Sequence, residues 1–514
     1  MNHKNTFLFL ILLLPSLCWL PAGFVSAAAA PKPNFIVINI DDMGYADIGP
    51  FGSKLNRTPN LDRMAKEGRK LACFYAAPVC SPSRAALMTG CYPKRVLPIS
   101  GVLFPAGAVG LTPEQRTVAE LLKEAGYATG CIGKWHLGDQ PPFLPTRRGF
   151  DYYLGIPYSN DMGMASEGSK SNLGDKLPEP RPANLTSGDE TGLHGASQPP
   201  LPLLENEKVV ARVKQDEQQG IVERYTTAAV KFIHERREKP FFLYLPHNAV
   251  HFPVYPGKTW AGKSPNGIYS DWVEEVDWSV GRVLDTLREL KLDSKTLVIF
   301  TSDNGGTPRA VNAPLRGFKG STWEGGMREP TIAWWPGHIP AGTRCDAITG
   351  MMDVLPTFVR LAGGQLPAGC KFDGCDIWPL LSGESKQTPH DVFYYFRGFK
   401  LEAVRSGPWK LHLGVAAPAK ANAKAKSKAQ AKANPNAPPS GPQLYNLDTD
   451  IGESKNVAKE NPDMVKKLQL LAERMKDDLG LDGVGPGCRA LGRVPEPKPL
   501  INHDGTIREG FAPR

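Results

Sequence analysis

The chain has 514 residues, which is enough for a large hydrophobic core and for two domains. Its formal net charge is +9, but Lys4 and five lysines between residues 417 and 441 supply most of that excess. The charge is therefore no evidence for a nucleic-acid-binding surface, and we predict no nucleic-acid partner.

Residues 1–30 have the pattern of a secretory signal peptide. Lys4 precedes an apolar run from Phe7 to Leu20, and small residues around Ala28 follow it. A membrane anchor is the less favoured alternative, because Pro15 interrupts a run that is already short for a ~30 Å span. No later stretch reaches the ~20 apolar residues of a membrane helix. We therefore predict a periplasmic or secreted protein with no membrane span after signal cleavage.

Short apolar runs then alternate with helical stretches. Strands are predicted over residues 35–40, 127–133, 241–245 and 296–300, and helices over 60–68, 118–126 and 273–290. This alternation predicts an α/β domain over residues 31–385, with a large, mainly parallel sheet between helices. Residues 155–222 are rich in Gly, Ser and Pro and show no period. We expect a long surface excursion there, which either shapes the pocket or has no function.

The pattern changes near Ser382. Strands are predicted over residues 390–396, 403–414 and 443–450, and a helix over 461–480. Residues 386–514 are therefore expected to form a small C-terminal α+β domain with an antiparallel sheet. The Ala/Lys-rich segment 417–441 interrupts it, and because this segment has no apolar face to bury we predict that it is disordered.

Polar side chains follow four of the predicted strands: Asp41 and Asp42, then Lys134 and His136, then His247 and His251, and finally Asp303 and Asn304. Open α/β sheets bind ligands beyond the carboxyl ends of their strands, so these side chains are expected to meet. Carboxylate and amide oxygens suit Ca²⁺, or less favourably Mg²⁺, rather than zinc. An isolated Asp pair could equally cap a loop or a helix.

The stretch VCSPSRAALMTG, residues 79–90, predicts a helix that begins near Cys80, because Pro82 suits a first turn and Gly90 a helix end. Cys80 would lie at the helix N-terminus, where backbone N–H groups attract an anion. Arg84, four residues on, could reach back to it. For a cysteine in an exported protein, a disulfide or a buried thiol is the simpler reading.

Nine cysteines occur in the chain, of which Cys18 lies in the predicted signal peptide. Export would permit disulfides, although pairing cannot be deduced from sequence. Cys370 and Cys375 are the nearest plausible local pair. An unmodified thiolate at Cys80 would be open to oxidation in the same compartment.

The stretch CSPSRAALMTG resembles the signature of the type I sulfatases. The blocks NFIVINIDDMGYAD, GKWHLG, LPHNAVHFP, TSDNGG and LRGFKGSTWEGGMREP are similar to family blocks in the same order, and LYNLDTDIGESKN is similar to the second-domain signature. The resemblance, to arylsulfatases and N-acetylgalactosamine-6-sulfatases, implies an alkaline-phosphatase-like domain followed by a small C-terminal domain.

The resemblance also implies that a separate maturation enzyme oxidises Cys80 to Cα-formylglycine. One hydroxyl of the hydrated aldehyde would attack the sulfur of a sulfate ester, and the second would later expel sulfate. The implied Ca²⁺ ligands are Asp41, Asp42, residue 80, Asp303 and Asn304. The implied catalytic roles are Arg84 fixing the hydrate, Lys134 and Lys319 neutralising the sulfuryl oxygens, His136 as base for elimination, and His251 assisting the leaving group with Lys319.

The sequence thus predicts an exported, calcium-dependent sulfatase that acts on a sulfated glycan, with aryl sulfates as assay substrates. Trp323, Tyr158 and Arg316 are candidates for an open glycan cleft. One alternative is a phosphatase or phosphodiesterase of the same superfamily, but such enzymes are expected to use Ser or Thr, often with two zinc ions. The other is a non-catalytic glycan-binding relative with an unmodified Cys80, which would not need the full set of cations and histidines.

Overall fold

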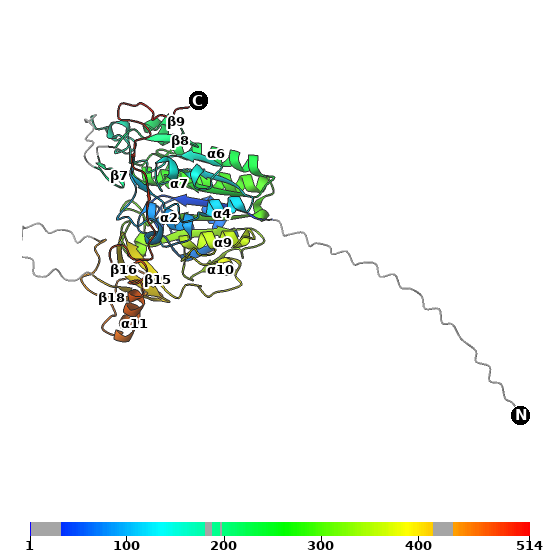
Figure 1. The fold of residues 1–514 in the computed structure, drawn as a ribbon, viewed down its shortest axis with the longest axis vertical. Helices are drawn as coiled ribbons and strands as arrows, with labels where there is room; N and C mark the ends of the chain where they lie inside the picture. The colour runs from blue at the N-terminus through cyan, green and yellow to red at the C-terminus, as the bar shows by residue number, and fades with distance from the viewer. Residues whose placement is uncertain (2–31, 180–187, 196–197, 415–434, 514) are drawn as a thin grey trace, which may run out of the picture. The chain divides into compact units, whose positions relative to one another are not determined.

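The first strand, β1 (Asn34–Ile40), lies at the centre of a mixed sheet. It pairs in parallel with β10 (Phe241–Pro246) and β11 (Thr296–Ser302), which come much later in the chain. Every residue of these three strands is buried, because helices cover both faces of the sheet. The computed structural model describes Met1 and residues 32–179, 188–195, 198–414 and 435–513 (Figure 1).

Among the described residues the main sheet has 11 strands, in the order β13-β2-β12-β11-β1-β10-β4-β5-β8-β9, with β14 paired to β2. Its remaining strands are β2 (Arg69–Tyr75), β4 (Ala128–Ile132), β5 (Tyr152–Gly155), β8 (Pro202–Glu205), β9 (Lys208–Arg212), β12 (Arg328–Trp334), β13 (Thr343–Cys345) and β14 (Thr349–Gly350). The strands from β11 to β5 that surround β1 run parallel, whereas β12 is antiparallel to both β11 and β2. The α/β fold with a mainly parallel sheet is confirmed.

Two hydrophobic clusters pack against opposite faces of this sheet because alternate residues of β1 point to opposite sides. Phe35 and Val37 join the cluster formed with α2 (Cys80–Thr89), α4 (Val118–Glu124), α9 (Val354–Leu361) and α10 (Trp378–Ser382). Ile36 and Ile38 join the cluster formed with α1 (Pro59–Glu67), α6 (Ile221–Arg236) and α7 (Ile268–Glu289).

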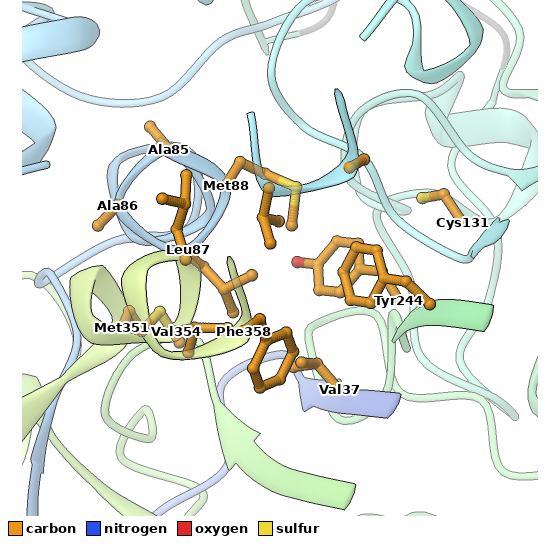
Figure 2. Close-up of a cluster of buried hydrophobic side chains, with 14 of the residues drawn as sticks. Val37, Ala85, Ala86, Leu87, Met88, Cys131, Tyr244, Met351, Val354 and Phe358 are labelled. Atoms are coloured by element: carbon orange, nitrogen blue, oxygen red, sulfur yellow. The ribbon is translucent and has the colours of Figure 1, made fainter. Parts of the chain in front are cut away.

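Helix α2, which begins at Cys80, is held in place by hydrophobic packing. Figure 2 shows Leu87 of α2 on the side of Val354 and Phe358 of α9, with Val37 of β1 next to Phe358, and Met88 of α2 on the side of Tyr244 of β10. Each such side chain contributes roughly 1.5–3 kcal/mol when fully buried. All ten residues of α2 are buried, so the helix is fixed on every side and its first residue has a fixed position.

The C-terminal region forms a separate antiparallel sheet of β15 (Phe393–Arg397), β16 (Lys400–Ser406), β17 (Trp409–His412) and β18 (Gln443–Asn446). Helix α11 (Pro462–Glu473) packs against it, below the main sheet in Figure 1. A third hydrophobic cluster joins the two sheets, for example through Tyr75 and Phe393, whose rings stack at 4.6 Å. The predicted small C-terminal sheet is therefore present.

The remaining short elements are α3 (Pro93–Val96), α5 (Gln215–Gln219), α8 (Glu324–Met327), and the two-stranded pairs β3 (Val109–Gly110) with β19 (Gly492–Arg493) and β6 (Gly188–Asp189) with β7 (Gly192–Leu193). The β3–β19 pair shows that the chain beyond α11 returns to the larger α/β domain. Across the described ranges, no helix is both long and apolar enough to cross a lipid bilayer.

Three expectations differ from the structure or fall outside it. Residues 155–222 are not only a surface excursion, because β8 and β9 extend the main sheet beyond β5. Cys370 and Cys375 are not bonded, and all eight cysteines from Cys73 to Cys488 are free in the described ranges. The predicted signal peptide and residues 417–434 lie outside the described residues, whereas residues 435–441 are described.

Candidate active site

The carboxyl ends of the central strands bring the predicted side chains together. Because Ile40 of β1 lies in register with Ser302 of β11, the residues that follow them meet at one edge. Asn304 Nδ2 donates to Asp42 Oδ1 at 2.7 Å, and the Asp42 N–H lies 3.4 Å from Asp303 Oδ1. One ligand atom each of Asp41, Asp42, Cys80 and His251 lies within 4.8 Å of the others.

Glycines make this close approach possible. Gly305 follows Asn304, and a Cβ on it would lie 1.9 Å from the carbonyl oxygen of Gly325. Any larger residue there would push the ligand-bearing turn out of position. Asp42 itself has a φ of 62°, a left-handed conformation in which its side chain turns toward Asn304 and Lys319.

Cys80 is the first residue of α2, as the sequence predicts, and is only 1% exposed. Its thiol donates to Asp41 Oδ1 at 3.3 Å, and Lys319 Nζ donates to Cys80 Sγ at 3.4 Å. Burial raises the pKa of the Cys80 thiol well above its ordinary value, and the carboxylates of Asp303 and Asp41 add to the increase. These neighbours therefore do not by themselves produce a thiolate nucleophile.

Arg84 lies one turn after Cys80 on the same helix, but its hydrogen bonds differ from the expected contact with residue 80. Its Nε and Nη2 donate to Asp303 Oδ2 at 3.0 and 2.7 Å, and its Nη1 donates to the Lys134 carbonyl at 2.5 Å. Burial acts to lower the pKa of Arg84, but Asp303 and other neighbours raise it overall. The guanidinium is thus a fixed charge that orients Asp303 and the strand end at Lys134.

Two lysines face the same carboxylates. Lys134 Nζ donates to Asp41 Oδ2 and, at 3.1 Å, to Ser159 Oγ. Lys319 Nζ lies 2.6 Å from Asp42 Oδ1. Burial alone would raise the pKa of Asp41, but Lys134 first, and then His251, Arg84 and Lys319, hold it well below its usual range. Asp41 is therefore ionised, as a metal ligand must be.

His136 is held in one tautomer by its surroundings. Its Nε2–H donates to the Leu103 carbonyl at 2.8 Å, so the lone pair is on Nδ1. Nδ1 is buried and has no hydrogen-bond partner among the described residues. Burial, with the charges of Lys134 and Arg84, lowers the pKa of His136 well below its ordinary value. The ring is therefore neutral at neutral pH and has one nitrogen able to accept a proton.

In His251 the nitrogen that donates to a backbone carbonyl is Nδ1, whereas in His136 it is Nε2. The His251 Nδ1–H donates to the Phe252 carbonyl, and its Nε2 lies 3.6 Å from Asp42 Oδ2. When protonated, His251 therefore presents an Nε2–H toward the carboxylate cluster. His247 points elsewhere, since its Nε2 pairs with Ser279 Oγ of α7 at 3.1 Å and burial lowers its pKa to about 3. It does not belong to the cluster.

Sequence reasoning missed two residues. Ser159 Oγ accepts from Lys134 Nζ and lies 3.4 Å from His251 Nδ1, so it links two predicted site residues, but a lone serine has no distinguishing pattern. Glu329 of β12 is fully buried, and neither of its carboxyl oxygens has a partner among the described residues. Burial, together with Asp303 and Asp42, raises the pKa of Glu329 well above its ordinary value.

Asp41, Asp42, Cys80 and His251 form a buried group that could hold a metal ion. Asn304 Oδ1 is buried without a hydrogen-bond partner in the described ranges, although a buried amide oxygen normally has one. Asp41, Asp42 and Asp303 converge on the same place, and the carboxylates of Asp303 and Asp42 add to the effect of burial in raising the pKa of the nearby Glu329. The donor set, mostly oxygen, fits Ca²⁺ or Mg²⁺ better than zinc.

The three candidates for an open glycan cleft are placed differently from the prediction. Trp323 and Tyr158 are 1% and 2% exposed, so neither can form a cleft wall. Arg316 is exposed, but its guanidinium stacks on the Trp323 ring at 3.7 Å and its Nη1 donates to the Glu453 carbonyl. The aromatic character that suggested sugar binding instead packs the loop that carries Lys319.

Comparison with known families and proteins identifies the family to which the chain belongs. The model of the family "Sulfatase" matches residues 33–364, and that of the "C-terminal region of aryl-sulfatase" matches residues 388–482. Human arylsulfatase A is 38% identical over 471 residues, which cover 87% of this chain and 89% of that protein. Dog N-acetylgalactosamine-6-sulfatase is 38% identical over 417 residues, covering 76% and 73% respectively.

Solved structures of other proteins are similar to this chain in fold. The PsFucS1 sulfatase from Pseudoalteromonas sp. has a TM-score of 0.72 at 29% identity, covering 87% of this chain and 91% of that one. Ps i-CgsB, solved in complex with k-i-k-neocarrahexaose, has a TM-score of 0.69 at 32% identity, covering 86% and 92%. The chain belongs to the type I sulfatase family, whose enzymes hydrolyse sulfate esters.

Proposed function

We propose that this sulfatase is an exported, calcium-dependent enzyme that removes O-sulfate groups from a glycan, using Cα-formylglycine made from Cys80. The observation that supports this best is the position of the Cys80 side chain between the Asp41 carboxylate and the Lys319 ammonium. The sulfur occupies the place of the hydroxyl groups that an oxidised, hydrated residue 80 would carry. A cation-binding cluster on one side and lysines on the other suit attack on an anionic ester.

Asp41, Asp42, Asp303 and Asn304 would hold Ca²⁺ together with residue 80. A bound cation would supply Lewis acidity, polarising both a hydroxyl of residue 80 and a sulfuryl oxygen of the substrate. The unpartnered Asn304 Oδ1 and the ionised Asp41 support this set. Arg84, through its two hydrogen bonds to Asp303, would keep that ligand in place.

Lys134 and Lys319 would neutralise the sulfuryl oxygens as negative charge shifts onto them during ester cleavage. Both ammonium groups face the carboxylate cluster, Lys134 fully buried and Lys319 partly buried, and such interactions are stronger away from water. An oxidised residue 80 would supply two geminal hydroxyls, one for attack on sulfur and one for release of sulfate.

The two histidines divide the proton transfers. Nδ1 of His136 is the unpartnered, unprotonated nitrogen of a neutral ring, and it would accept the proton that is lost when sulfate is released. His251, with Nδ1–H fixed by the Phe252 carbonyl, would deliver a proton from Nε2 to the departing alcohol, assisted by Lys319. The Leu103 carbonyl binds Nε2 of His136 and leaves Nδ1 available, whereas the Phe252 carbonyl binds Nδ1 of His251 and leaves Nε2 available, and these different orientations support the two roles.

A sulfated glycan is the proposed natural substrate. Ps i-CgsB, with 32% identity, was solved in complex with k-i-k-neocarrahexaose, and PsFucS1, whose fold is similar, is named as a sulfatase. Small aryl sulfates should serve in assays, since arylsulfatase A is among the relatives. The ring position of the sulfate would be found with a panel of sulfated sugars.

We also propose that residues 1–30 direct export and are removed, with residues 31–385 as the catalytic domain and 386–514 as the C-terminal domain. The protein would then be periplasmic or secreted, and a formylglycine-generating enzyme would be its maturation partner. The matches of the two family models to residues 33–364 and 388–482 support this division.

Peptide mass spectrometry across residues 70–95 tests the proposal directly, on protein co-expressed with a formylglycine-generating enzyme. We expect the cysteine residue to be replaced by an aldehyde, and Cys80→Ala to abolish release of sulfate while leaving the fold intact. The alternative hypothesis, a non-catalytic glycan-binding protein with an unmodified thiol, predicts an intact Cys80 and no turnover. Full sulfatase activity in Cys80→Ala would disprove the assignment of residue 80.

A further inference from the structure

The loop of residues 316–324, which carries Lys319, is intrinsically pliable. Gly317 and Gly320 have φ angles of 82° and 84° and lie on either side of Phe318 and Lys319. Glycine has more backbone freedom than any other residue, so two of them at this spacing leave the intervening dipeptide easy to move. Within the loop, the Ser321 N–H and Oγ donate to the Phe318 carbonyl at 3.1 and 2.7 Å, and contacts from outside the loop complete the fixing of Lys319.

One side of the loop is held by the catalytic domain. The Lys319 N–H donates to the Gly306 carbonyl at 3.1 Å, beside the ligand-bearing turn, and the Gly320 N–H donates to the Pro78 carbonyl at 2.8 Å, two residues before Cys80. These bonds leave the Phe318 N–H and the Lys319 carbonyl directed to the other side.

Asn436 occupies that other side. Its Oδ1 accepts from the Phe318 N–H at 3.0 Å, and its Nδ2 donates to the Lys319 carbonyl at 2.9 Å. A single side-chain amide thus binds the backbone on both sides of the Lys319 Cα, accepting from the N–H of Phe318 and donating to the carbonyl of Lys319, as a neighbouring strand would. The next residue, Ala437, accepts a bond from Trp323 Nε1 at 3.4 Å, at the far end of the same loop.

We propose that Asn436 is a positioning residue for Lys319, and that the end of the Ala/Lys-rich segment is therefore part of the catalytic apparatus. This proposal rests on the catalytic role proposed above for Lys319. Only an amide carries both a donor and an acceptor in the needed geometry: an ionised Asp lacks the donor and an aliphatic side chain lacks both. Asn436 acts through Lys319 and needs no contact with substrate.

The geometry explains why a small displacement would matter. Lys319 Nζ lies 2.6 Å from Asp42 Oδ1 and 3.4 Å from Cys80 Sγ, so it is set between a proposed metal ligand and the nucleophile position. Loss of the Asn436 side chain would leave the Phe318 N–H and the Lys319 carbonyl without their partners, although the bonds to Gly306 and Pro78 would remain. A misplacement of about 1 Å can reduce a rate by roughly 10²-fold.

The test starts with Asn436→Ala in the matured, calcium-loaded enzyme, assayed with an activated aryl sulfate so that slow variants remain measurable. We expect kcat to fall roughly tenfold with KM little changed, because Lys319 is needed most where charge develops in the transition state. Asn436→Asp should lose at least as much, since its carboxylate faces the Lys319 carbonyl. Mass spectrometry confirms equal conversion of residue 80 in all variants.

Asn456→Ala is the matched control. Asn456 Oδ1 also accepts two backbone bonds, from Leu444 and Ala458 at 3.0 Å each, but they lie in the C-terminal sheet region and not on the Lys319 loop. Its replacement should lower thermal stability and leave kcat unchanged. An equal loss of kcat in Asn456→Ala would show that any loosening of the C-terminal domain suffices, and would overturn the proposal.

A double-mutant cycle provides the decisive readout. In a Lys319→Ala background, Asn436→Ala should cause no further loss, because the residue through which it acts is gone. A full additional tenfold loss, or unchanged kcat in the single variants, would overturn the inference. Unimpaired activity of Lys319→Ala alone would instead contradict the proposed function, so the two failures are distinguishable.

Discussion

The edge of the main sheet that carries the proposed active site, called the catalytic edge below, and the junction between the two sheets both bury several charges, but the charges are paired in different ways. At the junction, Glu324 accepts from Tyr75, Arg328, Tyr395 and Lys410, so both carboxylate oxygens are occupied. At the catalytic edge, Asn304 Oδ1 and both oxygens of Glu329 have no partner in the part of the chain that is described.

The difference separates a structural network from a reactive one. Burial would raise the pKa of Glu324, yet Lys410, Arg328 and Arg405 together hold it below its ordinary range, which shows complete compensation. The catalytic edge instead keeps acceptors in excess over donors. Because an unpartnered buried polar group is costly, a bound cation would offset that cost at this edge.

Removal of the metal should cause the largest loss of sulfatase activity among these tests. If it did not, the contrast drawn above between the catalytic edge and the junction would be wrong. After exhaustive chelation, we expect sulfatase activity to fall roughly 10³-fold, the equivalent of the several kcal/mol that a Lewis-acidic cation contributes. Added Ca²⁺ should restore activity, and Zn²⁺ should not. Undiminished turnover in protein shown by elemental analysis to be metal-free would mean that the unpartnered oxygens serve another purpose.

Lys410→Met tests the junction. Lys410 Nζ lies 2.9 Å from both Glu324 Oε1 and Glu453 Oε1, and its side chain is fully buried. Removing one partner of a buried ion pair should reduce the free energy of unfolding by roughly 3–5 kcal/mol. Denaturant unfolding followed by circular dichroism measures this, and kcat per folded molecule should stay near the parent value. A large loss of kcat without loss of stability would give this network a catalytic role.

Glu275 of α7 shows a third solution, in which a buried carboxyl group keeps its proton. It accepts one bond, from the Gly257 N–H at 2.7 Å, and burial raises its pKa to about 8. Because the folded-state pKa exceeds the unfolded value, its contribution to stability is present at low pH and is lost as pH rises through about 8.

The free energy of unfolding should therefore fall by roughly 2–3 kcal/mol between pH 6 and pH 9 on account of this group alone. Glu275→Gln, which keeps the acceptor oxygen, should flatten that part of the stability curve. Unfolding curves of both proteins across this pH range make the comparison, and an equal slope in the two would exclude Glu275 as the source.

The smallest effect should come from an exposed pair. Lys231 and Glu235 lie one turn apart on α6, with nitrogen and oxygen 3.8 Å apart and side chains 75% and 51% exposed. Lys231→Ala should change the free energy of unfolding by no more than about 0.5 kcal/mol. A change comparable to that of Lys410→Met would show that burial is not what distinguishes these charge clusters.

Local patterns predicted the central strands and the residues that follow them, because each strand end reports its own chemistry. The hydrogen-bond partners of these side chains were harder to predict from the sequence. Arg84 could be placed on α2 from its spacing to Cys80, but its bonds to Asp303 depend on how β11 aligns with β1. Ser159 had no pattern at all, and its role is visible only once two strand ends meet.

Edges of the sheet were harder to predict than its centre. β8 and β9 are short segments inside a stretch rich in turn-forming residues, and pairing with β5 rather than local propensity makes them strands. β12 begins Arg-Glu-Pro, which does not read as a buried strand, yet it lies between β2 and β11. In both cases long-range packing overrides local preference.

The central position of β1 has a consequence for biosynthesis. The ribosome makes β1 and α2 long before β10 and β11, the two strands that enclose β1 and complete the edge beside residue 80. At about 5–20 residues per second, that interval lasts on the order of tens of seconds. Cys80 is 1% exposed once the sheet is complete, so any enzyme that modifies it has to act on the chain while the second half is still being made or has yet to fold.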